Sequence, residues 1–329
     1  MNRYELQIAE VLAAAVVRSP TRFAWKGRLN PAIDAPLEVE MDARARRRHL
    51  TEALADRFRR SWFCHGRAIP AQPAGSGMFT ADQALLRALS AANTGRGTWQ
   101  PGWTVERLDG DVAVSSDGAL RTRVPIADCR PVDGPLRPGA AIAVRLPKEL
   151  PFHSPGFNLM LGDADLPDGV EQVRVYWHVV EIGATRVVRM LTSRLNADDV
   201  PFELKVATHP LELHRCDAAV LYLSVEHFHA TRATLAAIAS DATAYLRPRI
   251  PALTLELAPG VGLAEGTRDA VSFGTHRCGL IAEAVVRAHE QGLTRPAARL
   301  AMVADRFAEA GVALDAPYRE PALAGRHVL

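Results

Sequence analysis

Two short segments near the middle of the chain carry side chains that could together move a proton and hold an anion. Apolar residues alternate with polar ones over residues 173–179 and again over residues 202–206. This period of two is typical of half-buried strands, in which successive side chains point to opposite faces. The polar set is Arg174, Tyr176, His178, Glu203 and Lys205. If both strands lie in one sheet, its polar face brings these five side chains together.

Lysine is so rare in this chain that Lys205 stands out. All but three of the 39 basic residues are arginine, and the other two lysines are Lys26 and Lys148. Arginine stays protonated near neutral pH, whereas burial or neighbouring cations can lower the pKa of a lysine. Lys205 is therefore a candidate general base. The alternative is a surface strand residue in a cross-strand pair with Glu203 or another neighbour.

Composition excludes several classes of protein. With 329 residues, 48% of them hydrophobic and 23% charged, the chain is typical of a soluble globular protein with a sizeable core. A net charge of +2 gives no electrostatic case for nucleic acid or membrane partners. The four cysteines lie far apart without a CxxC motif, and no apolar run approaches 18 residues. We therefore expect a cytoplasmic protein with reduced thiols and neither signal peptide nor membrane span.

The order of expected elements indicates an α+β fold. A helical N-terminal part precedes a mixed or antiparallel sheet that is flanked by helices. We expect a mainly helical region over residues 1–100 and an α+β catalytic region over residues 101–329. The segments read as helices are 3–17, 41–63, 80–92, 225–246 and 295–311. Residues 66–78 are rich in Gly, Pro and Ser and predict a loop, and residues 312–329 predict a loose tail.

Other candidate sites are weaker. Lys148 lies in a proline-rich loop that enters a strand, so it is a second anion-binding candidate beside the alternative of an exposed loop lysine. His276 and Arg277 lie at the start of a predicted helix, where unpaired N–H groups favour an anion. His227 and His229 are two residues apart and face apart on a helix, so we expect no metal site.

Several longer motifs resemble one known family, the HopA-type effectors named for a type III secretion effector. The resemblance covers roughly residues 40–320. The motifs are AANTGRGTWQPGW, VRLPKELPFHSPGF, VRVYWHV, VPFELKV followed by HP, RCDAAVLYL, PALTLELAPGVGLAE and SFGTHRC. The family also includes stand-alone proteins of bacterial peptide-maturation clusters, notably those that make class V lanthipeptides and thioamitides.

The resemblance implies an activity and a partner. In those clusters a kinase-like protein phosphorylates Ser or Thr of a precursor peptide, and the HopA-like protein eliminates the phosphate. The products are dehydroalanine and dehydrobutyrine. The set of side chains is also similar in roles to the phosphothreonine lyases of bacterial effectors, which use a lysine base, a histidine acid and arginine ligands without a cofactor. We therefore expect a phosphoserine/phosphothreonine lyase that needs no cofactor.

Such a reaction needs a neutral base, cations around the phosphate and an acid for the leaving oxygen. Lys205 fits the base, and Arg174 with Arg215 fits a bidentate phosphate clamp. Lys148 and Arg277 are further phosphate-binding candidates. His178 fits the acid, in competition with His209 and His276. Tyr222 or Tyr176 could hydrogen-bond the phosphate or the peptide carbonyl.

Two other functions remain open at this stage. One is a binding module that recruits a precursor peptide or a kinase without catalysis, which would tolerate loss of Lys205. The other is a secreted virulence effector. Against the latter, residues 3–17 predict a helix rather than a disordered, Ser-rich secretion segment.

Overall fold

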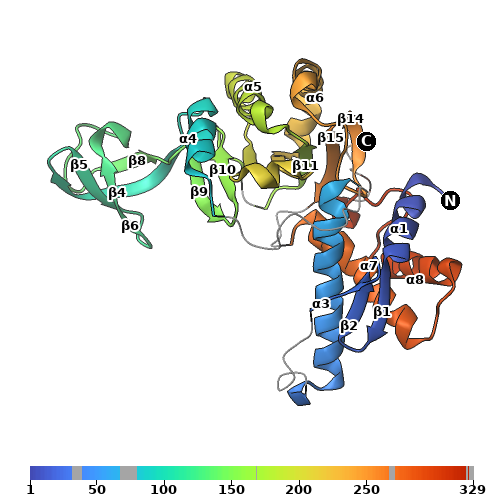
Figure 1. Cartoon of the computed structure of the whole chain (residues 1–329). Coiled ribbons are helices and arrows are strands. Elements are labelled where there is room, and N and C mark those ends of the chain that lie inside the picture. Colours follow the sequence, from blue (N-terminus) through green and yellow to red (C-terminus); the bar gives the residue numbers. More distant parts are fainter. Residues whose placement is uncertain (32–38, 67–79, 168, 267–270, 324, 326–329) are drawn as a thin grey trace.

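The computed structural model describes residues 1–31, 39–66, 80–167, 169–266, 271–323 and 325. These ranges contain helices and three antiparallel sheets, so the predicted α+β class is confirmed. A central body holds the largest sheet, a helical part extends from one end of it, and a small sheet projects from the other end (Figure 1). The loop predicted for residues 66–78 lies outside the described residues, apart from Gly66.

The central sheet has the strand order β14-β15-β11-β13-β12-β10-β9, and every neighbouring pair is antiparallel. Its strands are β9 (Glu149–Ser154), β10 (Phe157–Leu161), β11 (Gln172–Trp177), β12 (Glu203–Ala207), β13 (Ala219–Ser224), β14 (Leu255–Ala258) and β15 (Val261–Gly266). The two strands that alternate most clearly in the sequence, β11 and β12, are both in this sheet, with β13 between them. One sheet therefore carries the polar side chains of both alternating segments.

One face of the central sheet is covered by α4 (Gln83–Ala92), α5 (Ala184–Ala197) and α6 (Val225–Asp241). The apolar positions of β11 and β12, such as Trp177 and Leu204, are fully buried in this core. Burial of side chains of this size stabilises the fold by about 1.5–3 kcal/mol each. In Figure 1, α5 and α6 lie side by side on this face.

The opposite face carries the polar set. Among the described elements, the helices that pack there are α3 (Ala43–Ser61), η1 (Phe63–His65) and α7 (Phe273–Glu290). They contact the sheet at β11, where the rings of Phe63 and Tyr176 lie 6.3 Å apart, edge to face. Since these helices come from both ends of the chain, the sequence around β11 is enclosed by elements far away in sequence.

The N-terminal elements pack against the C-terminal helices. Helix α1 (Arg3–Ala14) begins with a capping box, and it leads into the three-stranded sheet of β1 (Ala15–Ser19), β2 (Arg22–Trp25) and β3 (Arg28–Leu29). The helix predicted over residues 3–17 therefore ends three residues early, because the β-branched Val16 and Val17 continue as a strand. On α8 (Pro296–Glu309), Arg299 donates to the carbonyls of Leu12 and Ala15 at 2.9 Å.

The projecting part is a five-stranded sheet of order β6-β5-β4-β8-β7 with a small core of its own. Its strands are β4 (Trp99–Asp109), β5 (Val112–Ser116), β6 (Arg121–Pro125), β7 (Cys129–Pro131) and β8 (Ala141–Arg145). Gly110 has a φ of 63° in the turn between β4 and β5, a conformation that favours glycine. The strands on either side of Asp109-Gly110 and of Asp117-Gly118 pair as antiparallel hairpins, β4 with β5 and β5 with β6. Within the described residues, no helix is long and apolar enough to cross a bilayer.

Candidate functional site

Lys205 lies on β12 where the central sheet is only partly covered. Its neighbours in the strand, Leu204 and Val206, are fully buried on the other face, while Lys205 itself is half-buried. The amine Nζ lies 4.3 Å from the centre of the Phe157 ring. Among the described residues it has neither a hydrogen bond nor an ion pair. Burial lowers the pKa of Lys205, the charge of Arg215 lowers it further, and Asp217 opposes this.

Arg215 lies beside Lys205 but is already occupied by carboxylates. Its Nε and Nη2 donate to the two carboxylate oxygens of Asp217 at 2.9 and 2.8 Å, and Nη1 donates to Glu212 at 2.6 Å. Burial opposes ionisation of Asp217, yet its pKa lies below the ordinary value because the Arg215 charge and hydrogen bonds outweigh burial. A phosphate bound to Arg215 would face these two carboxylates, so the structure does not support the predicted clamp role.

Three more predicted residues share the sheet face with Lys205. Tyr176 and Lys205 both lie opposite Val220, and Arg174 lies opposite Tyr222. Tyr222 is therefore a diagonal neighbour of Lys205 across two adjacent strands, a distance of about 7–8 Å between Cα atoms. Burial raises the pKa of Tyr222, so its hydroxyl stays protonated. Of the two tyrosines, Tyr222 is half-buried while Tyr176 is 4% exposed under Phe63.

Arg174 is buried and lies apart from Arg215. Its guanidinium is 5.9 Å from the centre of the Tyr222 ring and fills the space above Gly266, where any Cβ would overlap Nη1. The charge of Arg174 acts on Arg277, whose pKa is lowered mainly by burial. The predicted pairing of Arg174 with Arg215 in one clamp is not what the structure shows.

Lys148 lies away from this face, at the end of a helix. Its Nζ donates to the carbonyls of Ser90 and Asn93, both at 2.9 Å, at the C-terminus of α4. Helix C-termini attract cations because their last carbonyls are unpaired and the helix dipole is negative there. This explains Lys148 as a helix cap, and its predicted phosphate-binding role is not supported.

Arg277 is 0% exposed and holds the C-terminal segment onto the body. Its Nε donates to the carbonyl of Pro317 at 2.9 Å, and Nη2 donates to that of Arg319 at 2.7 Å and lies 3.6 Å from a carboxylate oxygen of Glu320. Nη1 faces Nδ1 of His276. The predicted anion site at this helix start is thus filled by the protein's own chain, and the tail predicted to be loose is docked as far as it is described.

His209, the other candidate acid, has a local structural partner. Its Nδ1 accepts from the backbone N–H of Leu211 at 3.2 Å, at the start of the short turn η4 (Pro210–His214). Within the described residues, no group of three or more His, Cys, Asp and Glu side chains is placed to hold a metal ion.

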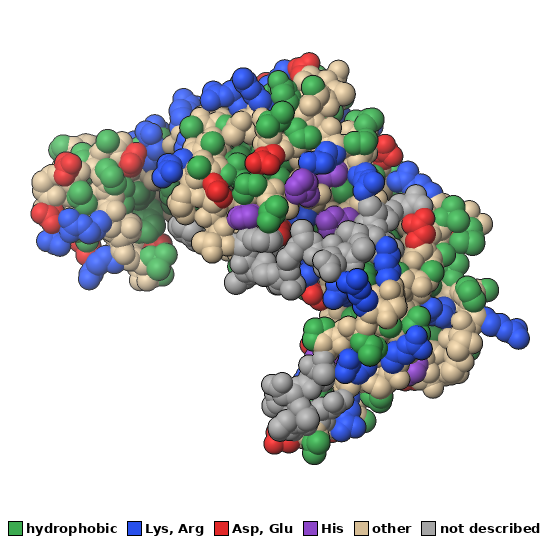
Figure 2. All heavy atoms as spheres, in the orientation of Figure 1, with side chains coloured by type: hydrophobic (Ala, Val, Ile, Leu, Met, Phe, Trp, Pro, Cys, Tyr) green, Lys and Arg blue, Asp and Glu red, His purple; other side chains and the backbone are tan. Residues whose placement is uncertain are grey.

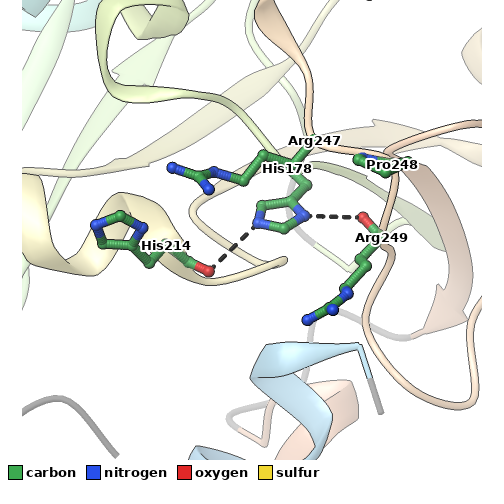
Figure 3. Close-up of a pocket in the computed structure, with 5 residues that line it drawn as sticks. All are labelled: His178, His214, Arg247, Pro248 and Arg249. Atoms are coloured by element: carbon green, nitrogen blue, oxygen red, sulfur yellow. Dashed lines mark hydrogen bonds between the residues drawn. The ribbon is translucent and has the colours of Figure 1, made fainter. Parts of the chain in front are cut away.

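His178 follows β11 and lines a pocket of about 320 Å³ (Figure 3). The other lining residues are His214, Arg247, Pro248 and Arg249. The ring nitrogens of His178 face two backbone carbonyls, with Nδ1 3.1 Å from Arg249 and Nε2 3.3 Å from His214. Burial lowers the pKa of His178 to about 4, against the effect of these hydrogen bonds and in line with the two arginine charges. The ring is therefore neutral at pH 7.

Because both of its nitrogens face carbonyls, His178 joins two loops rather than presenting a proton to the pocket. A neutral imidazole has one N–H and satisfies one carbonyl at a time. The predicted role of His178 as general acid is not supported by this geometry. Its place beside the polar face is nevertheless as expected, two residues beyond Tyr176 on the same strand direction.

Sequence reasoning missed Arg247 and Arg249. Both flank Pro248 in the loop between η5 (Thr243–Tyr245) and β14, and the guanidinium groups lie on either side of the His178 ring (Figure 3). The signal in the sequence was the Arg-Pro-Arg motif in a loop after a helix. In the space-filling view, histidine side chains gather near the middle of the molecule beside arginine or lysine side chains (Figure 2).

The pocket of Arg247 and Arg249, here called the arginine pocket, lies beside the Lys205 region on the polar face of the central sheet. His65 in η1 is half-buried. Burial lowers its pKa, the charge of Asp217 raises it, and the charges of Arg215 and Arg249 lower it. His65 therefore interacts with charged groups of both regions. By strand register, two strand spacings and two residues separate Lys205 from His178, which places their Cα atoms roughly 12 Å apart.

The chain belongs to the HopA1 effector protein family, which matches residues 149–319. This confirms the resemblance seen in the motifs. The matched segment is shorter than the predicted range of 40–320, and it contains the central sheet, Lys205 and the arginine pocket but not the projecting five-stranded sheet.

Two solved structures of Pseudomonas syringae effector proteins are similar to the chain. The effector from pathovar tomato strain DC3000 shares 17% identity, with a TM-score of 0.44 over 82% of this chain and 98% of that one. The effector from pathovar syringae strain 61 shares 14% identity, with a TM-score of 0.43 over 82% of this chain and 94% of that one. No curated protein matches the chain significantly.

Proposed function

We propose that the chain is a lyase that eliminates phosphate from phosphoserine and phosphothreonine residues of a peptide. The products are dehydroalanine and dehydrobutyrine. The observation that carries this proposal is Lys205, whose half-buried amine has no hydrogen bond or ion pair within the described part of the chain and whose pKa is lowered by burial. Family membership supports it through the resemblance to the lyase components of peptide-maturation clusters.

The reaction is a β-elimination whose atoms and electrons balance without a redox partner. Neutral Lys205 takes the proton from Cα of the phosphorylated residue, and that electron pair forms the Cα=Cβ double bond. The Cβ–O bond breaks, and its electron pair leaves with the phosphate. Lys205 ends as an ammonium and returns its proton to solvent. Burial favours the neutral amine that starts the cycle.

Tyr222 is the best placed of the predicted residues to stabilise the charge that develops on the peptide carbonyl. Removal of the Cα proton gives an enolate-like oxygen, which needs a hydrogen-bond donor. Tyr222 stays protonated because burial raises its pKa, and it is a diagonal neighbour of Lys205 on the same face. It donates its O–H to the carbonyl oxygen in this mechanism.

The leaving phosphate needs cations more than it needs an acid. A phosphate leaves as an anion, so positive charge near its oxygens lowers the barrier. His178 is neutral at pH 7 with both ring nitrogens toward carbonyls, and Arg215 is paired with Asp217 and Glu212. We therefore assign neither residue to direct contact with the phosphate.

The biological setting follows from the same resemblance. A kinase-like partner phosphorylates Ser or Thr of a precursor peptide, and this chain removes the phosphate in the cytoplasm. The four cysteines are free in the structure, as they would be in a reducing compartment. No nucleic acid or membrane takes part.

The family name favours a second candidate, a secreted effector that acts in a host. In that case the same Lys205 face would act on a host phosphoprotein or would bind a host partner without catalysis. A non-catalytic module that recruits a peptide or a kinase is the remaining alternative. These candidates differ in whether they need the Lys205 amine.

The deciding experiment is mass spectrometry of a phosphoserine/phosphothreonine peptide incubated with the purified chain. We expect loss of phosphoric acid with the wild type and none with Lys205→Ala, whose fold is checked by circular dichroism. An unphosphorylated peptide is the control. Loss that persists in Lys205→Ala would contradict this site, and no loss from the cognate phosphorylated precursor with its kinase present would favour the binding module.

A further inference from the structure

We infer that the pocket beside His178 and His214 binds a phosphate monoester on a peptide, and that the guanidinium groups of Arg247 and Arg249 make the contacts to the phosphate. None of the residues in the predicted phosphate clamp lies in it. The identity of the phosphate as the one that is eliminated rests on the proposed function, whereas binding itself does not.

The protein leaves the positive charge of this pocket unmatched. Within the described residues, neither Arg247 nor Arg249 has a hydrogen bond or an ion pair from its guanidinium, and Nε of Arg247 is buried without a partner. Two acidic groups on this face, Glu212 and Asp217, are held by Arg215. A buried donor without a partner costs about 1–3 kcal/mol, which a bound anion would recover.

Backbone hydrogen bonds already form the pocket. The N–H of Arg247 donates to the carbonyl of His178 at 2.8 Å, and the His178 N–H donates to the carbonyl of Gly260 at 2.9 Å. Gly260 has a φ of 80°, and any Cβ there would overlap the Arg247 carbonyl. The loop that carries both arginines is thus fixed against the β14–β15 turn, and little ordering is needed on binding.

The donors that line this pocket are of a kind that binds phosphate well. Guanidinium groups present several N–H donors in one plane and match the oxygens of a phosphate in pairs. Two of them stand on either side of the His178 ring, and Pro248 between them restricts the backbone (Figure 3). A volume of about 320 Å³ is at the small end of ligand sites and suits a phosphorylated side chain.

The position relative to Lys205 makes the pocket useful for the reaction. The Cα atoms of Lys205 and His178 are roughly 12 Å apart by strand register. A lysine side chain and a phosphoserine side chain extended toward each other span this gap. Lys205 here leans over Phe157, so it turns away from that ring to reach a substrate held in the pocket.

The test measures binding separately from turnover. Full-length Lys205→Ala protein, which lacks the proposed base, is titrated by calorimetry with a phosphoserine peptide and with inorganic phosphate. Arg247→Ala and Arg249→Ala are added to this background singly and together. Truncation of Arg249 leaves its carbonyl, so the hydrogen bond to His178 is retained. Arg186→Ala on α5 is the matched control, because Arg186 is exposed and α5 covers the other face of the sheet.

We expect the Kd of the phosphopeptide to rise about tenfold or more for each pocket arginine, with no change for Arg186→Ala. Inorganic phosphate should compete with the peptide. An unchanged Kd in the double variant would overturn the inference, as would equally tight, arginine-dependent binding of the unphosphorylated peptide. If binding is lost as expected but the wild type eliminates nothing, the pocket stands and the lyase proposal fails. If the wild type eliminates phosphate and the double variant binds normally, the lyase proposal stands and the pocket inference fails.

Discussion

Arg277 and Arg247 are both arginines on the polar side of the central sheet, and the protein treats their charges in opposite ways. Arg277 is 0% exposed and donates to two carbonyls beside Glu320. Arg247 and its neighbour Arg249 have no such partners among the described residues and border a pocket. Arg277 uses its N–H donors to hold the C-terminal segment in place. Arg247 and Arg249 keep theirs available for a ligand.

The same division separates the two lysines that sequence reasoning singled out. Lys148 donates to two carbonyls at the end of α4, whereas the amine of Lys205 contacts the face of Phe157. A cation whose donors are all used by the fold is poor evidence for a ligand site. The partners of each basic group therefore say more about function than its place in a motif.

The largest effect should separate the two lysines by activity. Lys205→Arg keeps the positive charge but cannot give a neutral base, so we expect the elimination rate to fall by about 10²–10⁴-fold. Lys148→Met should leave the rate unchanged. Time courses by mass spectrometry measure both. Wild-type turnover by Lys205→Arg would show that Lys205 is not the base.

A second prediction separates paired from unpaired arginines by stability. Arg215→Ala leaves Asp217 and Glu212 without their partner in a mostly buried place, so we expect a loss of about 3–5 kcal/mol in the free energy of unfolding. Arg247→Ala removes no interaction within the described fold and takes away a buried donor without a partner, so it should not lower the free energy of unfolding. Urea denaturation of both variants gives the two values. Equal losses would remove the distinction between the two groups.

A third prediction concerns the pH dependence of stability that arises from His178, which joins the two pocket loops. The pKa of His178 is lowered from 6.5 to about 4 in the folded state, so below pH 6.5 the unfolded chain binds a proton that the folded chain refuses. Stability should therefore fall between pH 6.5 and about 4, by about 3 kcal/mol at most, and then level off for this group. His178→Gln should lack this component. Denaturation curves at several pH values compare the variant with the wild type, since other histidines titrate in both. The same pH slope in both proteins would contradict the assignment.

The smallest effect should come from the helix cap. Lys148→Met removes two hydrogen bonds to the last carbonyls of α4, and we expect a loss of about 1–2 kcal/mol in unfolding free energy. Arg186→Met is a suitable control, because Arg186 is exposed on α5. A thermal or urea melt shows the difference. No loss for Lys148→Met would mean that Lys148 is available for a ligand after all.

Local patterns predicted which side chains share a sheet face, although β11 is buried on both faces rather than half-buried. The alternation around Arg174 and Lys205 places both on one face, as the register through β13 shows. The Asp-Gly pair at Gly110 is of a kind that favours hairpin turns, and the chain does turn there between β4 and β5. These features depend on the nearest residues in the chain, which the sequence displays directly.

What the sequence could not show is which charges meet across the fold. Arg215 is paired with Asp217 two residues away, a contact that a loop permits but does not require. Arg277 meets carbonyls about forty residues later, and Arg249 meets His178 from another loop. These contacts depend on tertiary packing, which the sequence does not display. For this reason the clamp of Arg174 and Arg215 was predicted wrongly and the arginine pocket was missed.

The packing of α1 against α8 has a consequence for synthesis on the ribosome. Arg299 caps α1 at the Leu12 carbonyl across 287 residues of sequence, and the rings of Tyr4 and Tyr318 lie 6.0 Å apart. At about 5–20 residues per second, the partners of α1 emerge roughly 14–57 s after it. During this interval Ile8 and Val11, which end fully buried, lack the part of their core that the C-terminal helices supply. The helical part thus closes only late in translation, and the nascent first helix is a natural client for a chaperone.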